Sequence, residues 1–168
     1  MTDFKRLLRA LVDDEVEFIL VGGMAAAAHG SSRDTRDLDI VRRTSQNIQR
    51  LARALQPLSP YLRGAPPGLP FQWDARSIER GLNFTLTTTA GAIDALGEIA
   101  GGGYEQLLPH TVQIEVLGMR CLCLNLDKLI HVKRAAGRPR DLKRCGRWPR
   151  KKNSNVSYAF PSSRGTGS

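Results

Sequence analysis

The chain has 168 residues, a length that corresponds to a single domain with one hydrophobic core. Apolar residues make up 41% of the sequence, which excludes a wholly disordered protein. The formal net charge of +9 is unevenly placed, because residues 1–137 carry 16 basic and 15 acidic groups whereas residues 138–168 carry nine and one. The charge therefore characterises the C-terminal segment and says little about the function of the globular part.

The sequence predicts a cytoplasmic protein without a membrane segment. No secretory signal is visible, and no apolar run approaches the 18 residues that a spanning helix needs. Cys121, Cys123 and Cys145 lack the paired spacing of a structural zinc site, so we expect reduced cysteines.

Helices and strands alternate in the first part of the chain. The predicted elements are a helix at 4–12, a strand at 16–21, a helix at 24–29, a strand at 37–41 and a helix that includes 48–55. Thr2 is the expected N-cap of the first helix, and Gly30 is placed to end the second. Thr44 or Ser45 is expected to cap the third helix, which stops at Pro57.

Antiparallel strands are predicted in the second part. Residues 57–70 hold five of the nine prolines and are expected to form a loop outside the sheet. The elements that follow are strands at 82–88 and 92–96, a short helix at 104–108, a hairpin at 112–117 and 119–124, and a helix at 126–136. Gly91 and Gly118 mark the turns, and Asn125 is the expected cap of the last helix. This order predicts an α/β or α+β fold with a mixed β-sheet flanked by helices.

Gly22 and Gly23 separate the first predicted strand from the helix that follows. Backbone N–H groups at such a turn are unpaired, and without a Cβ a phosphate group can approach them closely. The alternative is that the two glycines only make a tight turn. The motif lacks both the Gly-Lys-Ser/Thr of a Walker loop and the third glycine of a dinucleotide fingerprint.

Asp37 and Asp39 lie two residues apart in a predicted strand, so both carboxylates project from the same face while Leu38 and Ile40 face the core. Like charges so close together repel each other unless a cation lies between them. Mg²⁺ is the usual cation for paired carboxylates and a substrate phosphate. The alternative is a solvated strand end with two acidic side chains.

Together these two motifs resemble the signature of the polymerase-β-like nucleotidyltransferase superfamily, in particular its small bacterial members related to the minimal nucleotidyltransferases. That signature is a hydrophobic residue before Gly-Gly or Gly-Ser, a helix, and Asp-x-Asp with hydrophobic flanks. Val21-Gly22-Gly23 and Asp37-Leu38-Asp39-Ile40 match its two halves, and His29-Gly30 and Thr35-Arg36 fill the interval in a similar way. The resemblance covers residues 4–142 and implies a nucleotidyltransferase fold.

The superfamily has a third carboxylate on a later, adjacent strand. Asp94 and Glu115 are the candidates, because each is flanked by apolar residues. We prefer Asp94, which follows a strand and a glycine turn as in the small members, and Glu115 is the alternative.

The resemblance implies a transferase that moves NMP from an NTP such as ATP to a hydroxyl acceptor. Asp37, Asp39 and Asp94 would be both the catalytic residues and the ligands of two Mg²⁺ ions. Gly22, Gly23, Arg36 and Lys133 would bind the nucleotide, although Arg36 also fits a surface residue and Lys133 the polar face of its helix.

The resemblance leaves the acceptor open among a tRNA end, a protein hydroxyl and a small molecule. Minimal nucleotidyltransferases often belong to toxin–antitoxin pairs, so a cognate toxin or antitoxin protein is an implied partner. The rival interpretation is a non-catalytic module of the same fold that binds a protein partner or RNA.

The pattern of the family stops after Leu142, where small members continue with another amphipathic helix. Residues 143–168 are rich in basic residues, serine and glycine, and we predict a disordered tail after a domain at 1–142. One interpretation is a replaced reading frame, and the other is a basic tail that guides an RNA acceptor through phosphate contacts.

Overall fold

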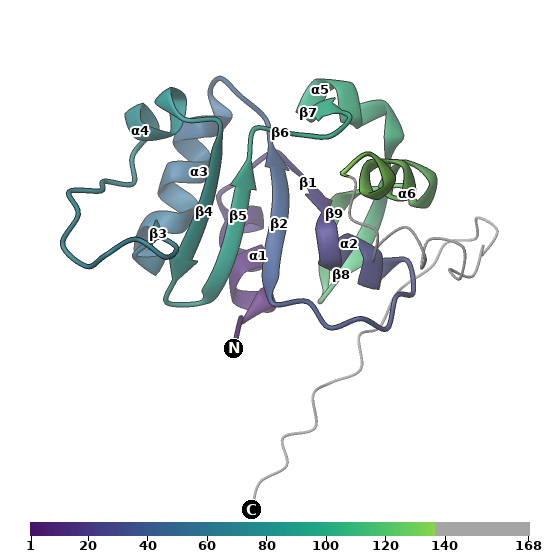
Figure 1. Ribbon diagram of the computed structural model, residues 1–168, viewed down its shortest axis with the longest axis horizontal. Coiled ribbons are helices and arrows are strands. Elements are labelled where there is room, and N and C mark those ends of the chain that lie inside the picture. Colours follow the sequence, from purple (N-terminus) through teal and green to yellow (C-terminus); the bar gives the residue numbers. More distant parts are fainter. Residues whose placement is uncertain (137–168) are drawn as a thin grey trace, which may run out of the picture.

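The computed structural model describes residues 1–136, which form a mixed α/β structure around one seven-stranded sheet (Figure 1). The strands, in spatial order, are β3 (Tyr61–Leu62), β4 (Asn83–Thr88), β5 (Gly91–Leu96), β2 (Asp37–Arg42), β1 (Phe18–Val21), β9 (Met119–Leu124) and β8 (Thr111–Val116). The pairs β2–β5 and β1–β9 are parallel, and the other pairs of this sheet are antiparallel. The expected mixed sheet with flanking helices is confirmed.

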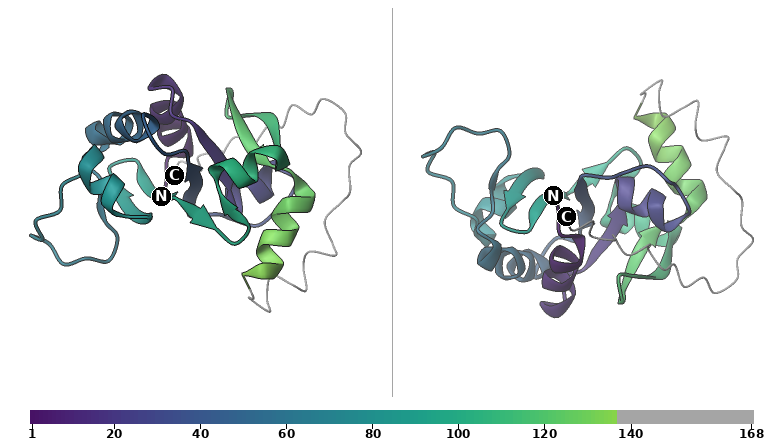
Figure 2. Two further views of the ribbon diagram at one scale, coloured as in Figure 1. Left: turned by 90° about the horizontal axis from the view of Figure 1, so that it is seen from above. Right: turned by 90° about the horizontal axis from the view of Figure 1, so that it is seen from below.

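Helices pack on both faces of the sheet. Behind it in Figure 1 lie α1 (Phe4–Asp13) and α3 (Asn47–Leu55), with α4 (Ala75–Arg80) packed beside α3, and in front lie α2 (Gly22–Ala28) and α6 (Leu126–Ala135). Figure 2 shows the two helix layers from above and below. A small hairpin of β6 (Glu98–Ile99) and β7 (Gly102–Gly103) leads into α5 (Tyr104–Leu107), and 3-10 turns follow α3 at Gln56–Leu58 and α5 at Leu108–His110.

The apolar faces of these elements meet in one core. Leu7, Leu8 and Leu11 recur at helical spacing in α1 and are fully buried. Leu38 and Ile40 alternate with the two aspartates of β2 and are fully buried as well, as the period of two predicts. Burial of each such side chain stabilises the fold by about 1.5–3 kcal/mol, so the core holds β2 firmly in place.

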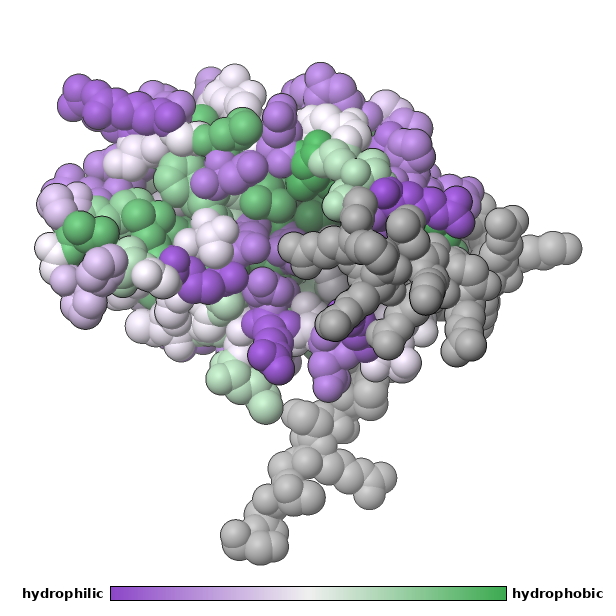
Figure 3. Space-filling view, viewed as in Figure 1, coloured by the Kyte–Doolittle hydropathy of each residue, from purple (hydrophilic) through white to green (hydrophobic). Residues whose placement is uncertain are grey.

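The front of β4 and β5 is covered by none of the helices in residues 1–136. Along β4 the exposed residues Asn83, Thr85 and Thr87 alternate with buried ones, which is typical of a strand with one solvated face. In the space-filling view from this side, hydrophilic side chains lie in the middle of the face beside apolar ones (Figure 3). This open face is where a ligand can reach the sheet.

Two of the predicted helix caps were wrong. The N-cap of α1 is Asp3, whose carboxylate accepts a hydrogen bond of 3.0 Å from the Arg6 amide, whereas the Thr2 hydroxyl donates to the Arg36 carbonyl. Neither Thr44 nor Ser45 caps α3, which begins at Asn47 with no side-chain hydrogen bond at its N-cap. Asp3 is the N-cap of α1 because the side chain of its neighbour Thr2 is bound to Arg36, a residue distant in sequence.

The prediction that residues 57–70 lie outside the sheet was also wrong. Tyr61 pairs with Thr87 and Leu62 with Leu86, so the segment adds β3 to the edge of the sheet. The prolines permit this because the two-residue strand falls between Pro60 and Pro66, where no proline has to donate to the ladder. Helix α4 and the β6–β7 hairpin were not predicted, since both are too short to show a hydrophobic period.

The C-terminal hairpin and the last helix were predicted correctly. β8 and β9 pair over their whole length, and the Asn125 side chain accepts a hydrogen bond of 2.8 Å from the Lys128 amide at the start of α6. Within residues 1–136 no helix is both long enough and apolar enough to cross a bilayer. The domain boundary at 142 and the tail at 143–168 lie outside the described residues.

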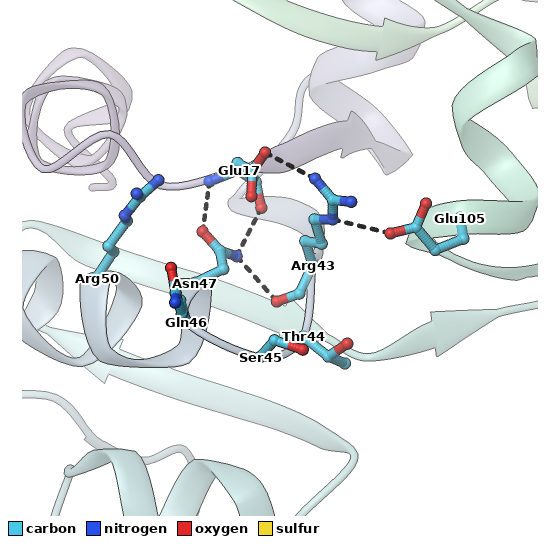
Figure 4. Close-up of a pocket in the computed structure, with 8 residues that line it drawn as sticks. All are labelled: Glu17, Arg43, Thr44, Ser45, Gln46, Asn47, Arg50 and Glu105. Atoms are coloured by element: carbon cyan, nitrogen blue, oxygen red, sulfur yellow. Dashed lines mark hydrogen bonds and ion pairs between the residues drawn. The ribbon is translucent and has the colours of Figure 1, made fainter.

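Asn47, the first residue of α3, forms hydrogen bonds to the residues that flank β1 and β2 (Figure 4). Its buried side chain accepts a hydrogen bond of 2.6 Å from the Glu17 amide and donates to the carbonyls of Glu17 and Arg43 at 2.8 and 2.9 Å. The Glu17 carbonyl also accepts a hydrogen bond of 3.1 Å from the Arg43 amide, whereas the Glu17 amide and the Arg43 carbonyl have the Asn47 side chain as their partner. The side chain thus joins the entry of β1 to the exit of β2.

We predict that Asn47→Ala lowers the free energy of unfolding by about 2–4 kcal/mol, because it leaves the part-buried Glu17 amide and Arg43 carbonyl without their partner. Urea denaturation followed by circular dichroism measures this change. Gln46→Ala is the control, since Gln46 is exposed and its loss is expected to cost no more than about 0.5 kcal/mol. Equal losses in the two variants would contradict the role given to Asn47.

Candidate metal centre

The parallel pairing of β2 and β5 brings three carboxylates together. Asp39 lies directly opposite Asp94 in the register of these strands, and Asp37 projects from the same face two residues earlier. One carboxylate oxygen from each residue lies within 4.8 Å of the other two. The residues thus form a compact acidic group on the open face of the sheet.

Glu115, the alternative third carboxylate, is exposed on the edge strand β8, where it lies opposite Arg120. Two strands separate β8 from β2, which corresponds to about 14 Å at ordinary strand spacing. Glu115 therefore cannot join Asp37 and Asp39 at one cation, and Asp94 takes the third position.

The glycine pair lies against this acidic group. Helix α2 begins at Gly22 itself, with a φ of +65°, a conformation that favours glycine. A Cβ atom at Gly22 would come within 2.1 Å of the Asp39 carboxylate, and one at Gly23 within 2.4 Å of the Thr35 hydroxyl. The Gly23 amide donates a hydrogen bond to Asp39. The missing side chains therefore allow the start of α2 to touch Asp39.

Arg63 belongs to the site although no motif in the sequence includes it. Its guanidinium lies across two of the aspartates, with Nη2 2.8 Å from Asp94 Oδ1 and Nη1 3.3 Å from Asp37 Oδ2, and Nη2 also donates to the Leu86 carbonyl at 3.0 Å. No local signal marks Arg63, because β3 has two residues and is too short to show a period.

Strand register explains how Arg63 reaches the acids. Its amide donates to the Thr85 carbonyl at 3.0 Å, which extends the pairing of β3 with β4 by one residue. Thr85 in turn lies opposite Asp94, which lies opposite Asp39. The four residues form one row across the sheet, so their side chains share its open face.

The pKa of Asp39 is raised to about 7, first because the carboxyl is buried and then because the charges of Asp37 and Asp94 are close. The Gly23 amide opposes this shift. The pKa of Asp94 is also raised, chiefly by burial, while the positive charge of Arg63 lowers it. One guanidinium thus fails to compensate the negative charge of this cluster.

The donor set fits a hard divalent cation. Three carboxylates offer oxygen ligands of the type that Mg²⁺ and Mn²⁺ prefer, and a doubly charged ion would remove the repulsion that raises the pKa of Asp39. Asp37, Asp39 and Asp94 are the residues that would hold it.

Two residues expected to bind a nucleotide lie outside this group. Arg36 is exposed and directly precedes β2. Lys133 is half-buried on α6, a helix that packs against α2. The structure therefore brings Gly22 and Gly23 to the carboxylates, and the roles of Arg36 and Lys133 stay predictions.

A second, polar pocket lies at the opposite end of β2 (Figure 4). Arg43 lies at its centre, 2.9 Å from Glu17 and 2.8 Å from Glu105, with its guanidinium 5.6 Å from the centre of the Tyr104 ring. The two ion pairs of Arg43 connect the entry of β1 and the exit of β2 to α5.

The fold thus forms a site of three carboxylates beside a glycine turn. Comparison of the chain with protein-family models gives no match, and comparison with curated proteins gives no significant match either. The geometry and chemistry of the site are therefore the basis for assigning a function.

We predict that Gly22→Ala lowers the free energy of unfolding by more than about 2 kcal/mol and abolishes stabilisation by Mn²⁺, because the new methyl group displaces Asp39. Thermal denaturation with and without Mn²⁺ measures both effects. Gly30→Ala is the matched control, since Gly30 also has a positive φ but faces open space. It is expected to lose about 1 kcal/mol and to keep its response to Mn²⁺. If both variants keep that response, the contact with Asp39 is unimportant.

The raised pKa of Asp39 predicts how stability depends on pH without divalent ions. Between the unfolded value of 3.8 and about 7 the native state binds this proton more tightly, so stability falls as pH rises through this window. The loss from this group is about 4 kcal/mol when complete. Asp39→Asn removes the charge and should make the protein more stable than the wild type at pH 8 in EDTA.

Denaturation at pH 5, 6, 7 and 8, in EDTA and in Mn²⁺, tests this expectation. Mn²⁺ should stabilise the wild type most at pH 8 and should leave Asp39→Asn nearly unaffected. Glu115→Gln removes one carboxylate at the far edge of the sheet and should behave as the wild type does. A wild-type pH profile in Asp39→Asn would refute the assignment.

Proposed function

We propose that the protein is a nucleotidyltransferase of the polymerase-β-like superfamily, transferring NMP from an NTP such as ATP to a hydroxyl group. The observation that carries the proposal is the convergence of Asp37, Asp39 and Asp94 on one open sheet face, against the Gly22-Gly23 turn. The resemblance in sequence predicted this grouping, and the register of β2 and β5 is consistent with it.

In this reaction the acceptor oxygen attacks the α-phosphorus in line, a new P–O bond forms, and the bond to the pyrophosphate leaving group breaks. Asp37 and Asp39 would hold two Mg²⁺ ions, one of which Asp94 shares. The bound ions supply charge stabilisation at the entering and leaving oxygens.

Asp94 is suited to accept the proton of the attacking hydroxyl. Its half-buried carboxylate lies opposite Asp39 in the register of β2 and β5, beside the position proposed for the ions. Its place on β5 beside the exposed threonines of β4 leaves room for an acceptor on the open face. The candidate acceptors are a tRNA end, a protein hydroxyl and a small molecule.

The second candidate function is a non-catalytic module that binds a protein partner or RNA, with a cognate toxin or antitoxin as the implied protein. The ion pairs of Arg63 with Asp37 and Asp94 favour it, because they use the same carboxylates that would hold the ions. The two candidates differ in whether phosphorus is transferred.

We predict that the wild type transfers label from an α-³²P-NTP, and none from a γ-³²P-NTP, to total RNA or to a component of a cell lysate. Asp37→Asn/Asp39→Asn should lower the rate at least about 1,000-fold, because it removes the charge that binds both ions. Gel electrophoresis and thin-layer chromatography identify the labelled product and pyrophosphate.

Glu115→Gln is the control and should retain the wild-type rate, since it leaves the carboxylate group intact. Transfer that persists in the double variant would refute the site. No transfer with any NTP and acceptor would favour the binding module instead.

A further inference from the structure

Arg63 and a divalent cation compete for the same carboxylates. The guanidinium nitrogens lie 2.8 Å from Asp94 and 3.3 Å from Asp37, and these residues are two of the three that would ligate the cation. A ligated Mg²⁺ lies about 2.0–2.1 Å from its oxygen ligands. Two positive groups would then face each other across one half-buried carboxylate, where their repulsion is poorly screened.

The backbone that leads to Arg63 is paired on one side only. β3 has two residues and lies at the edge of the sheet, so a single neighbouring strand pairs with it. The Arg63 Nε atom is buried without a hydrogen-bond partner, while the side chain as a whole is 30% exposed. The guanidinium therefore has a free donor and a path to solvent on the open face.

A polyphosphate offers Arg63 a partner as good as the one it would lose. A guanidinium binds phosphate and carboxylate oxygens through the same planar, charge-assisted hydrogen bonds. A donor whose phosphates share the cations with the aspartates would lie beside the guanidinium, because the Arg63 side chain reaches past Thr85 in the row across the sheet and contacts Asp94. A rotation of the Arg63 side chain would then move the guanidinium from the carboxylates to the phosphate.

We propose that Arg63 occupies the cation position when no ligand is bound, and that it turns to the polyphosphate of the donor when divalent ions bind the aspartates. This inference rests on the proposed function. Arg63 makes binding of the ion alone weak and makes the ion and the polyphosphate bind cooperatively, since each favours the same position of the side chain.

The test is a titration of Mn²⁺, followed by electron paramagnetic resonance at pH 8, with and without inorganic tripolyphosphate. For Arg63→Gln we expect Mn²⁺ alone to bind about tenfold more tightly than in the wild type, because the competing charge is gone. Tripolyphosphate should tighten Mn²⁺ binding at the protein much less in this variant than in the wild type. A residue with only a structural role would weaken both kinds of binding or neither.

Two further variants complete the experiment. Arg63→Lys keeps the charge but cannot reach across two carboxylates in the same planar geometry, so its affinity for Mn²⁺ alone should lie between those of the wild type and Arg63→Gln. Arg120→Gln removes one positive charge from an exposed residue of β9 and should bind both ligands as the wild type does. If Arg63→Gln does not fold by circular dichroism, Arg63→Lys decides the outcome.

The proposal is overturned if Mn²⁺ alone binds the Arg63 variants no more tightly than the wild type, or if tripolyphosphate has the same effect on both. It is also overturned if tripolyphosphate leaves Mn²⁺ binding to the wild type unchanged. The label-transfer assay separates this result from the proposed function. Tighter Mn²⁺ binding and lost cooperativity in the variant, without transfer by the wild type, would leave the role of Arg63 standing and refute the nucleotidyltransferase.

Discussion

Asp39 and Asp94 lie opposite each other in a parallel strand pair. The other features of the site depend on the closeness of these two carboxylates. Like charges in directly opposed positions destabilise a sheet. Three arrangements reduce this repulsion. The raised pKa of Asp39, about 7, keeps its carboxyl protonated below that pH, and the Gly23 amide donates a hydrogen bond to Asp39. Arg63 forms an ion pair with Asp94 from the edge of the sheet. None of them compensates the cluster fully, which is why a divalent ion is the natural complement.

The pair can exist because the rest of the fold holds its backbone rigidly. Leu38 and Ile40 bury the opposite face of β2, so a shift of one residue in register would place leucine and isoleucine in solvent and both aspartates in the core. The start of α2 lies so close to the Asp39 side chain that only glycine fits at position 22. Packing on one face thus fixes the positions of the charges on the other.

The predictable part of the structure is the part with a local period. Alternation along β2 predicted which residues face the core, and the resemblance to known nucleotidyltransferases supplied Asp94. Arg63 was beyond reach, since its place depends on pairing between residues 22 positions apart and β3 is too short for any period. The prediction of the N-cap of α1 was wrong for a related reason. Thr2 and Asp3 are both favourable N-cap residues, and only the contact of Thr2 with the distant Arg36 decides between them.

The uncompensated charge also bears on the choice between an enzyme and a binding module. Arg63 contacts Asp37 and Asp94, and two carboxylates suffice for one guanidinium; Asp39 adds a third negative charge whose burial costs stability at neutral pH. In a module that merely binds a partner, asparagine at this position would keep the shape and remove the cost. A local arrangement that lowers stability in this way is characteristic of a functional site, and a divalent metal ion is the group that would compensate the excess charge.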